Sequence, residues 1–598
     1  MPSLEDIAYG AGLANVDPAS LSGALRSAGL AALRQPDRLG RSLVDLALTE
    51  GRVGMNTLGR LAGGKPEPVS TPPAGDRRFA DRAWKENALL AGLVDAYLSC
   101  AVWAQDLVDG SDLDEDTRRK ARFALGMMID ALAPSNTPWL NPEVSREAID
   151  TKGLSLLRGA RNFVHDVRHN GGRPSQVDTE RFTVGVNLAA TPGRVVLRNQ
   201  LIELIAYEPQ TPKVHAEPIL CCPPWINKYY IMDLAPGRSF VEYAVQHGFT
   251  VFMISYRDPD QSLSELTMDD YLQLGILSAL DRVEKLTGAP RVNLVALCLG
   301  GTLALIALAY LAARGESKRV GWATLTNTLA DFTEAGDLRV FTDEKSVAHL
   351  ERTMRKKGYL EASRMAGTFD WLRGNDLVWN YVVSNWYMGK KPPAFDILAW
   401  NGDGTRMPAV MHSQYLRACY LDNLLVKPGA FSIAGETVDL GAIKNPLYVL
   451  SAEADHIAPW RAAYRTTQLV GGEARFTLTS SGHIAGIVNP PGNPKASHWV
   501  QEGCPPDPED WRKGATRVGG SWWEDWLPWA KRRSGALISP PTLPQGEAAP
   551  GLHVRGQTGP LVPGNGADGT RKPRNPKPKR ATARRARTRA RVRPAARP

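Results

Sequence analysis

Cysteine is scarce in this sequence, and the cysteines present show no metal-binding pattern. Six cysteines are spread over 598 residues, at positions 100, 221, 222, 298, 419 and 504. They form no C-x-x-C pair and no His/Cys cluster at the spacing of zinc sites, so neither a disulfide framework nor a structural metal site is indicated. The adjacent pair Cys221-Cys222 ends an apolar run and is expected to pack in a core strand.

The sequence also lacks a secretory signal and a long uninterrupted apolar run. The stretch from Leu299 to Ala312 is broken by glycines and a threonine, and it is shorter than the roughly 20 residues that a membrane-spanning helix needs. The first residues, Met1 to Asp6, contain no basic region followed by an apolar one. We therefore expect no transmembrane segment and a cytoplasmic location.

Acidic residues are absent from the last 28 residues of the chain. Residues 571–598 hold 13 lysines and arginines, so the other 570 residues carry −3 of the chain's net charge of +10. This stretch has almost nothing to bury, and we expect residues 536–598 to form a disordered Pro/Arg-rich basic tail. Such a tail either contacts a polyanion such as nucleic acid through its phosphates or only keeps the protein soluble.

The length of the chain indicates two to four domains, and its local patterns divide it. Residues 1–75 are punctuated by Gly and Pro and predict a poorly structured N-terminal segment. In residues 76–180 apolar side chains recur at spacings of three and four, which predicts a helical N-terminal domain. In residues 181–535 strand and helix patterns alternate, which predicts an α/β domain with a parallel sheet covered on both faces.

The alternation lapses at about residues 330–440, where we expect a cap inserted into the α/β domain. Residues 331–430 contain 13 of the chain's 45 Phe, Trp and Tyr residues, against about 7.5 for an even spread. An enrichment of this kind suits a lid over an apolar channel, a subunit contact or the small core of the cap itself.

Cys298 lies where a nucleophile is expected in an α/β-hydrolase fold. It follows the apolar run that ends at Leu297 and precedes Gly300-Gly301 and an apolar stretch of helical length. This is the pattern of a nucleophile elbow, a sharp strand-to-helix turn, although Ala296 stands where the motif has its first glycine. The alternative is a buried structural cysteine. A thiol nucleophile is informative about the reaction, because an acyl group bound to a thiol stays activated for transfer.

The partners of Cys298 are expected in a fixed order, with the acid first and the histidine second, each after a later strand. Asp455 follows the strand pattern at 447–451, and His483 follows the one at 475–478. Glu453 in the same loop is the rival acid. His456 adjoins the acid but comes too early to be the base, so we interpret it as a neighbour in the site or a substrate contact. A neutral thiol needs such a base within hydrogen-bond reach.

An oxyanion hole on this fold combines the amide after the nucleophile with an amide from the loop after an earlier strand. The first amide is that of Leu299. The loop is residues 223–230, and Trp225 or Ile226 is expected to provide the second donor.

These motifs together resemble the polyhydroxyalkanoate synthases, in particular the single-subunit class that prefers short-chain monomers. The similarity runs from about residue 162 to residue 529. The shared motifs are Pro223-Pro224-x-Ile226-Asn227-Lys228-Tyr229-Tyr230, Cys298-x-Gly300-Gly301-Thr302, Asn375-Asp376-Leu377-Val378-Trp379-Asn380-Tyr381, Trp400-Asn401-Gly402-Asp403, Asp455-His456-Ile457-x-Pro459-Trp460, Ser481-Gly482-His483-Ile484-Ala485-Gly486, Asn489-Pro490-Pro491 and Gly520-Ser521-Trp522-Trp523.

The resemblance implies an acyltransferase that polymerises (R)-3-hydroxyacyl-CoA, with (R)-3-hydroxybutyryl-CoA as the expected monomer, and releases CoA. By the family pattern Cys298 carries the acyl group, His483 is its base, and Asp455 either orients His483 or helps activate the incoming hydroxyl. No metal or redox cofactor is implied. The family's dimers and its place on polymer granules imply a homodimer and a granule surface as partners.

Asn227 and Trp400 lie in shared motifs. Together with His456 they are candidates for substrate contact. Trp225 stands where a smaller residue is common and is expected to narrow the channel mouth. Two other functions stay open: a thioesterase or polymer depolymerase of the same fold, and a granule-surface or nucleoid-tethering protein that works through the basic tail.

Overall fold

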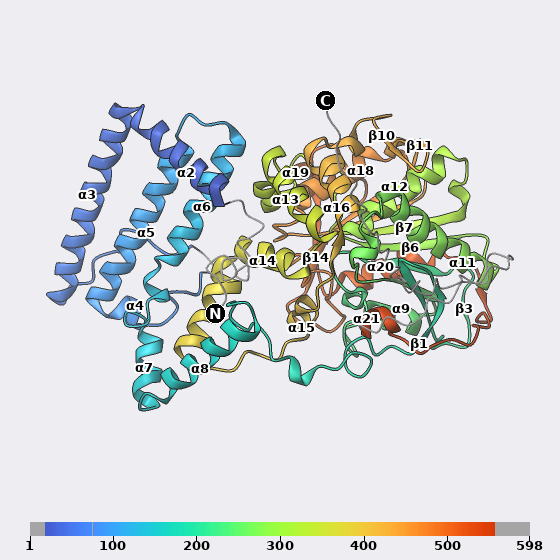
Figure 1. Cartoon of the computed structure of the whole chain (residues 1–598), viewed down its shortest axis with the longest axis horizontal. Coiled ribbons are helices and arrows are strands. Elements are labelled where there is room, and N and C mark those ends of the chain that lie inside the picture. The colour runs from blue at the N-terminus through green and yellow to red at the C-terminus, as the bar shows by residue number, and fades with distance from the viewer. Residues whose placement is uncertain (1–17, 74–75, 556–598) are drawn as a thin grey trace, which may run out of the picture.

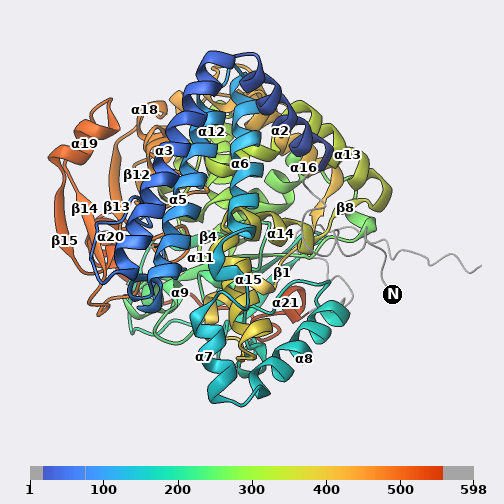
Figure 2. The same ribbon diagram turned by 90° about the vertical axis from the view of Figure 1, so that its left-hand side faces the viewer.

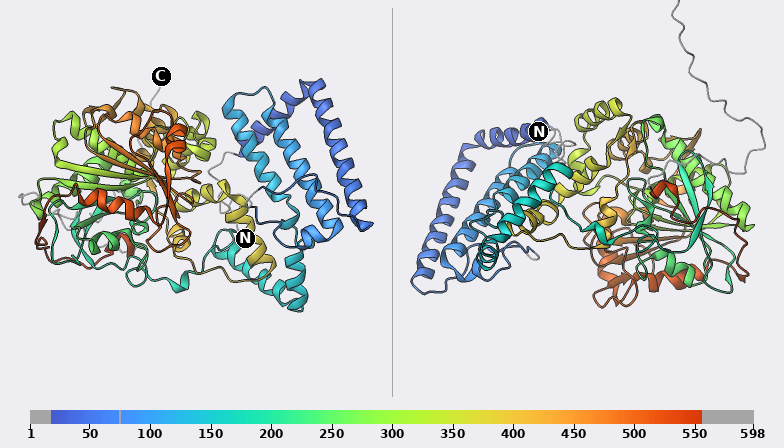
Figure 3. Two further views of the ribbon diagram at one scale, coloured as in Figure 1. Left: turned by 180° about the vertical axis from the view of Figure 1, so that it is seen from behind. Right: turned by 60° about the horizontal axis from the view of Figure 1, so that its bottom comes forward.

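The computed structural model describes residues 18–73 and 76–555. A layer of long helices formed by the N-terminal residues lies beside a larger α/β part (Figure 1). Figure 3 shows the same two parts from behind and from below, with the strands confined to the α/β part.

The α/β part is organised around one ten-stranded mixed sheet. Its strand order is β1-β2-β5-β4-β6-β7-β12-β13-β14-β15. The bounds are Gly193–Arg198 (β1), Ile202–Tyr207 (β2), Ile219–Cys222 (β4), Val251–Tyr256 (β5), Val292–Leu297 (β6), Val320–Thr326 (β7), Leu447–Ala452 (β12), Ala474–Thr479 (β13), Ser497–Val500 (β14) and Thr516–Gly519 (β15). The strands from β5 to β13 are parallel, and the pairs outside them are antiparallel. This confirms the predicted α/β-hydrolase fold.

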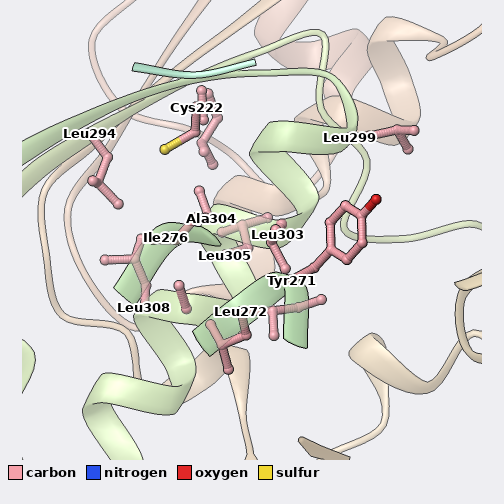
Figure 4. Close-up of a cluster of buried hydrophobic side chains, with 14 of the residues drawn as sticks. Cys222, Tyr271, Leu272, Ile276, Leu294, Leu299, Leu303, Ala304, Leu305 and Leu308 are labelled. Carbon is pink, nitrogen blue, oxygen red and sulfur yellow. The ribbon is translucent and has the colours of Figure 1, made fainter. Parts of the chain in front are cut away.

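Helices cover both faces of the sheet because its central strands are apolar on both sides. One face carries α11 (Ser278–Thr287) and α12 (Leu299–Ala313), and the other carries α9 (Phe240–Gln246) and α20 (Trp522–Lys531). Cys222 and Leu294 pack toward the α12 side (Figure 4), whereas Cys221 packs toward the opposite side. The adjacent cysteines therefore serve the two cores, as expected for a core strand.

Helix α12 is buried along most of its length. All residues from Leu299 to Leu311 are buried, and an apolar stretch without a polar side is typical of a helix enclosed by protein. Each fully buried leucine here contributes about 2 kcal/mol to stability. This burial holds the helix that follows Cys298 rigidly against β6.

The N-terminal part is a layer of helices that pack side by side. Their bounds are Pro18–Leu33 (α2), Pro36–Leu61 (α3), Ala83–Glu86 (α4), Ala88–Asp109 (α5), Glu115–Ala131 (α6), Pro142–Asp150 (α7) and Leu154–His169 (α8). Figure 2 shows α3, α5 and α6 next to one another. The layer therefore begins well before residue 76.

Helices α2 and α3 correct the prediction of a poorly structured segment at residues 1–75. Its glycines at 23, 29, 40, 51 and 54 lie within these helices with open space around them, at a cost of about 0.5–1 kcal/mol each relative to alanine. Contacts with α5 compensate: the Trp103 indole donates to Ser42 Oγ at 2.7 Å, and Arg60 pairs with Asp95 at 3.1 Å. Residues 1–17 and 74–75 lie outside the described residues.

Among the described residues, α5 is the one helix whose length and apolar composition would allow it to cross a membrane. In the structure it packs between α3 and α6. Its buried Asp95 forms the ion pair with Arg60. These contacts place α5 within the helical layer.

Between β7 and β12 the chain leaves the sheet and forms a cap over its carboxyl edge. The cap contains α13 (Glu344–Lys357), α14 (Ala362–Leu372), α15 (Asp396–Gly402), α16 (Ala409–Tyr415) and the hairpin β10 (Phe431–Ile433) and β11 (Glu436–Val438). Three wide helical turns, η9 (Asn375–Trp379), η10 (Val382–Tyr387) and η11 (Leu416–Leu421), connect them.

The helical layer docks onto this cap. Lys120 of α6 pairs with Asp343 at 2.7 Å, and the Trp386 indole of η10 donates to Asp166 of α8 at 2.8 Å. Gly159 of α8 lies so close to the backbone of Trp386 that a Cβ atom would collide with it. In Figure 1 the cap helix α14 accordingly lies between the two parts.

The end of the described chain corrects a second prediction, that residues 536–598 are disordered. Strand β16 (Leu537–Ile538) pairs with β3 (Val214–His215), and the buried Glu203 accepts hydrogen bonds from the amides of Leu552 and His553 at 3.2 and 3.0 Å. Residues 536–555 are thus fixed because the α/β part satisfies their backbone groups. The predicted disorder of residues 556–598 lies outside the described residues.

Candidate active site

Cys298 occupies a strained turn between β6 and α12. Its backbone has φ of 52° and ψ of −118°, a left-handed region that few non-glycine residues adopt. The turn is fixed because the amide of Cys298 donates to Thr326 O at 2.8 Å, while the amides of Gly301 and Thr302 donate to Cys298 O at 2.9 and 3.1 Å. This is the geometry of a nucleophile elbow, with the N-terminus of α12 favouring negative charge beside the sulfur.

The two glycines after Cys298 are required by close packing. A Cβ atom on Gly300 would collide with the carbonyl oxygens of Cys222 and Pro223, and one on Gly301 with the side chain of Thr328. Ala296 lies earlier, inside β6, where it is fully buried. Alanine is therefore accommodated at the first small position, and the turn still forms.

His483 and Asp455 meet at the carboxyl edge of the sheet. His483 Nδ1 lies 2.6 Å from Asp455 Oδ2, and both side chains are nearly inaccessible to solvent. Asp455 Oδ1 accepts hydrogen bonds from the amides of Ile457 and Ala458, both at 2.9 Å. The rival acid, Glu453, instead pairs with Arg512 at 3.0 Å near the surface.

Cys298 lies close enough to His483 to affect its pKa, so His483 stands between Cys298 and Asp455. Burial acts to lower the pKa of His483, but the Asp455 carboxylate and the Cys298 sulfur outweigh it and hold that pKa well above its ordinary value. A proton that leaves the thiol therefore finds a stabilised position on the imidazole. The arrangement can generate a sulfur nucleophile.

His456 lies beside this group without taking part in it. Burial, followed by the positive charge of Arg373, lowers the pKa of His456. Its Nδ1 is buried without a hydrogen-bond partner among the described residues. His456 is thus available as a neutral contact for a bound substrate.

The loop after β4 lies against the elbow, as an oxyanion hole requires. Leu299 is the first residue of α12, so its amide has no intrahelical acceptor. The carbonyl oxygens of Cys222 and Pro223 are in contact range of Gly300, and Ile226 and Cys298 pack against the buried cluster that contains Trp225. The Trp225 side chain is only 2% exposed. The indole thus packs inward against Tyr415 of the cap, and its predicted narrowing of the channel mouth stays a prediction.

Two predicted substrate contacts fasten this loop. The Trp400 indole donates to Lys228 O at 2.7 Å, and Trp400 packs in the core on the α9 side of the sheet. Asn227 forms a backbone bridge with Gly404 of the cap, and its Oδ1 accepts from the Lys228 amide at 2.9 Å. The structure thus uses both residues to hold the loop to the cap.

The site includes residues that no sequence motif singles out. Tyr415 and Tyr420 of the cap lie close enough to Cys298 for its charge to affect them: burial, and then the neighbouring acidic groups including Cys298, raises the pKa of both hydroxyls. Asn327, at the end of β7 with φ of 47°, donates its side-chain amide to His483 O. The aromatic enrichment of the cap was the one available signal for the tyrosines.

In residues 18–73 and 76–555 no group of three acidic, histidine or cysteine side chains is arranged to hold a metal ion.

Comparisons with known proteins match two regions of the chain and several relatives. Residues 75–244 match the family model described as the poly-beta-hydroxybutyrate polymerase (PhaC) N-terminus, and residues 217–490 match the alpha/beta hydrolase fold. The chain is 41% identical to a poly(3-hydroxyalkanoate) polymerase of Methylorubrum extorquens over 88% of both chains. It is 42% identical to the poly(3-hydroxyalkanoate) polymerase subunit PhaC of Rhizobium meliloti, over 83% of this chain and 82% of the other. For the subunit of the same name from Cupriavidus necator the identity is 42%, over 83% and 85%.

Proposed function

The chain belongs to the poly(3-hydroxyalkanoate) polymerase family, and we propose that it joins (R)-3-hydroxyacyl groups from CoA thioesters through an acyl group carried on Cys298. The observation that supports this role is the position of His483, in contact with both Cys298 and Asp455. (R)-3-hydroxybutyryl-CoA is the proposed monomer.

In the first half of the reaction the Cys298 sulfur attacks the thioester carbonyl of the monomer. His483 takes the thiol proton, and the amides of Leu299 and of Trp225 or Ile226 stabilise the oxyanion of the tetrahedral intermediate. The bond between the carbonyl carbon and the CoA sulfur then breaks, and His483 returns the proton to the leaving thiolate. One thioester replaces another, so this step has little free-energy cost.

In the second half a 3-hydroxyl group attacks the acyl group on Cys298. His483 takes the hydroxyl proton, a C–O bond forms, and the Cys298 sulfur leaves and is reprotonated. Because Asp455 is buried and hydrogen-bonded to His483, the role proposed for it in both halves is to orient and charge-stabilise His483. Conversion of a thioester to an oxygen ester is downhill, which favours chain growth, and the aromatic cap can exclude water.

The test is the product formed from (R)-3-hydroxybutyryl-CoA by the purified protein. Release of CoA together with insoluble polyester supports the proposal. Release of CoA with only free 3-hydroxybutyrate would identify a thioesterase instead. Cys298→Ala should lower CoA release by at least about 1,000-fold, and a variant that keeps full turnover would contradict the role of the thiol.

A contact with the polymer granule is proposed for the helical layer. Nineteen of the twenty-four large apolar side chains exposed in the described residues lie between Leu30 and Val164. Val44, Leu48 and Met55 of α3 are 58%, 64% and 70% exposed, and an apolar surface of this kind indicates an interface. The triple substitution of these three residues by glutamine should weaken binding to polyester particles. A shift in oligomeric state without loss of particle binding would assign the surface to a homodimer instead.

The basic tail and the free cysteines support two more proposals, a polyanionic partner and a reducing compartment. The 13 basic side chains of residues 571–598 support contact with a polyanion such as nucleic acid. The six cysteines are unpaired, and a thiol nucleophile must stay reduced, which supports a reducing compartment such as the cytoplasm.

A further inference from the structure

Six aromatic side chains form a continuous cluster beneath the cap, here called the aromatic cluster. Its members are Trp225, Tyr256, Tyr271, Phe332, Tyr415 and Tyr420. The Trp225 ring lies 5.9 Å from that of Tyr271 and 5.5 Å from that of Tyr415, in edge-to-face geometry. Tyr415 continues to Tyr420 at 5.7 Å. Trp225 therefore joins the sheet side of the cluster to the cap side.

The aromatic cluster adjoins the nucleophile. The charge of Cys298 affects the hydroxyls of Tyr415 and Tyr420, and Cys298 packs against the buried cluster that also contains Trp225 and Leu299. In Figure 4 the Tyr271 ring lies on the same side of the buried cluster as Leu299, the residue that follows Cys298. The rings of Tyr415 and Tyr420 are thus neighbours of the sulfur that would carry an acyl group.

Unpartnered polar atoms mark the same place. The Trp225 Nε1 and the Tyr256 hydroxyl are fully buried, with no hydrogen-bond partner among the described residues. Buried polar groups are normally paired, and a ligand that carries ester oxygens offers the acceptor that the indole lacks. The Trp225 Nε1 is therefore an available donor for an ester oxygen of a bound acyl chain.

We propose that Trp225 closes the acyl site beside Cys298 and limits the substituent at C3 of the monomer to a short alkyl group. This inference rests on the proposed function. Close-packed side chains leave little room for added methylene groups, and a single methylene in an apolar pocket changes kcat/KM by about 10- to 200-fold. The wild-type chain thus discriminates against monomers whose side chain reaches the indole.

Trp225→Leu tests the proposal, with Trp511→Leu as the matched control. Trp511 is equally buried and also has an unpartnered Nε1, but its ring packs on Tyr464 and Phe476. The measurement is kcat/KM for CoA release from the (R)-3-hydroxybutyryl, hexanoyl and octanoyl thioesters. The ratio of octanoyl to butyryl values should rise at least about 10-fold in Trp225→Leu and stay unchanged in Trp511→Leu.

An unchanged ratio in Trp225→Leu, or an equal change in both variants, would overturn the proposal. If Trp225→Leu does not fold, Trp225→Phe keeps an aromatic ring of smaller volume, and its ratio must rise in the hexanoyl comparison. Absence of CoA release by the wild-type protein from all three thioesters would instead contradict the proposed function.

Discussion

His483 and Asp455 are joined by a 2.6 Å hydrogen bond from Nδ1 to Oδ2, while the second oxygen of Asp455 accepts two backbone amides. Three hydrogen bonds and burial therefore hold the carboxylate in place. A fixed carboxylate holds one tautomer of the imidazole, with Nε2 directed at the nucleophile.

Asp455→Asn should lower kcat by about 10,000-fold, because the amide stabilises the wrong tautomer of His483 and removes the charge that raises its pKa. The measurement is the steady-state rate of CoA release. Glu453→Gln is the control in the same loop, since Glu453 pairs with Arg512 near the surface and should change kcat less than twofold. Equal losses in the two variants would contradict the assignment of Asp455.

Gly300→Ala should destabilise the protein by about 1–3 kcal/mol and abolish most CoA release. The added methyl collides with the carbonyls of Cys222 and Pro223, which displaces the loop that carries Trp225 from the elbow. Chemical denaturation and turnover report the two effects. Ala296→Gly, inside β6, is the control and should retain activity, because the turn does not depend on this methyl.

Two alanine substitutions test the docking of the helical layer on the cap. Gly126 of α6 has open space around it, so Gly126→Ala should stabilise the protein by about 0.5–1 kcal/mol through helix propensity. Gly159→Ala adds the same methyl to α8 but collides with Trp386, and it should destabilise. The free energy of unfolding of each variant gives the sign, and stabilisation by both would show that α8 and η10 do not pack as described.

The meeting of Asp455 and His483 could be predicted because each lies in the loop that follows a strand, and Cys298 directly follows β6. The strand patterns can be recognised one at a time, and the order of parallel strands brings such loops to one edge of a sheet. The catalytic roles of the three residues stay a prediction. The contacts of Tyr415 and Tyr420 could not be predicted in this way. They come from a cap more than 100 residues after Cys298, and its path over the sheet is set by tertiary packing.

The predictions for residues 1–75 and 536–598 were wrong for one physical reason. Contacts with residues distant in the sequence stabilise both segments. Glycines in α2 and α3 indicated a break, but packing on α5 sustains those helices. Proline and glycine near residue 545 likewise indicated disorder, whereas Glu203 and β1 hold that segment. Local propensity is a weak guide where a partner from another part of the chain satisfies the backbone.

Truncation after residue 560 should leave CoA release unchanged and remove binding to duplex DNA. The residues that are lost include all 13 basic side chains of 571–598, and binding through phosphates weakens steeply with salt. The affinity for a short duplex is measured at several salt concentrations. A full-length variant with these 13 residues changed to glutamine is the matched control, and retained DNA binding in either variant would contradict a role for the tail charge.

His412→Leu should remove part of the acid sensitivity of the cap. His412 of α16 is buried, neither ring nitrogen has a hydrogen-bond partner among the described residues, and burial lowers its pKa to about 4. The unfolded chain has an ordinary histidine pKa of about 6.5 and so binds the proton first as pH falls. The contribution of neutral His412 to the free energy of unfolding is therefore fully present above pH 6.5. It decreases by about 3 kcal/mol as pH falls to 4.

The free energy of unfolding at pH 7 and pH 5 tests this sign. The wild-type protein should lose more stability between the two pH values than His412→Leu does, because leucine binds no proton in either state. His349→Leu removes a partly exposed histidine from the neighbouring helix α13 and serves as the control for loss of an imidazole from the cap. An identical pH dependence in wild type and His412→Leu would show that protonated His412 has a hydrogen-bond acceptor in the folded cap.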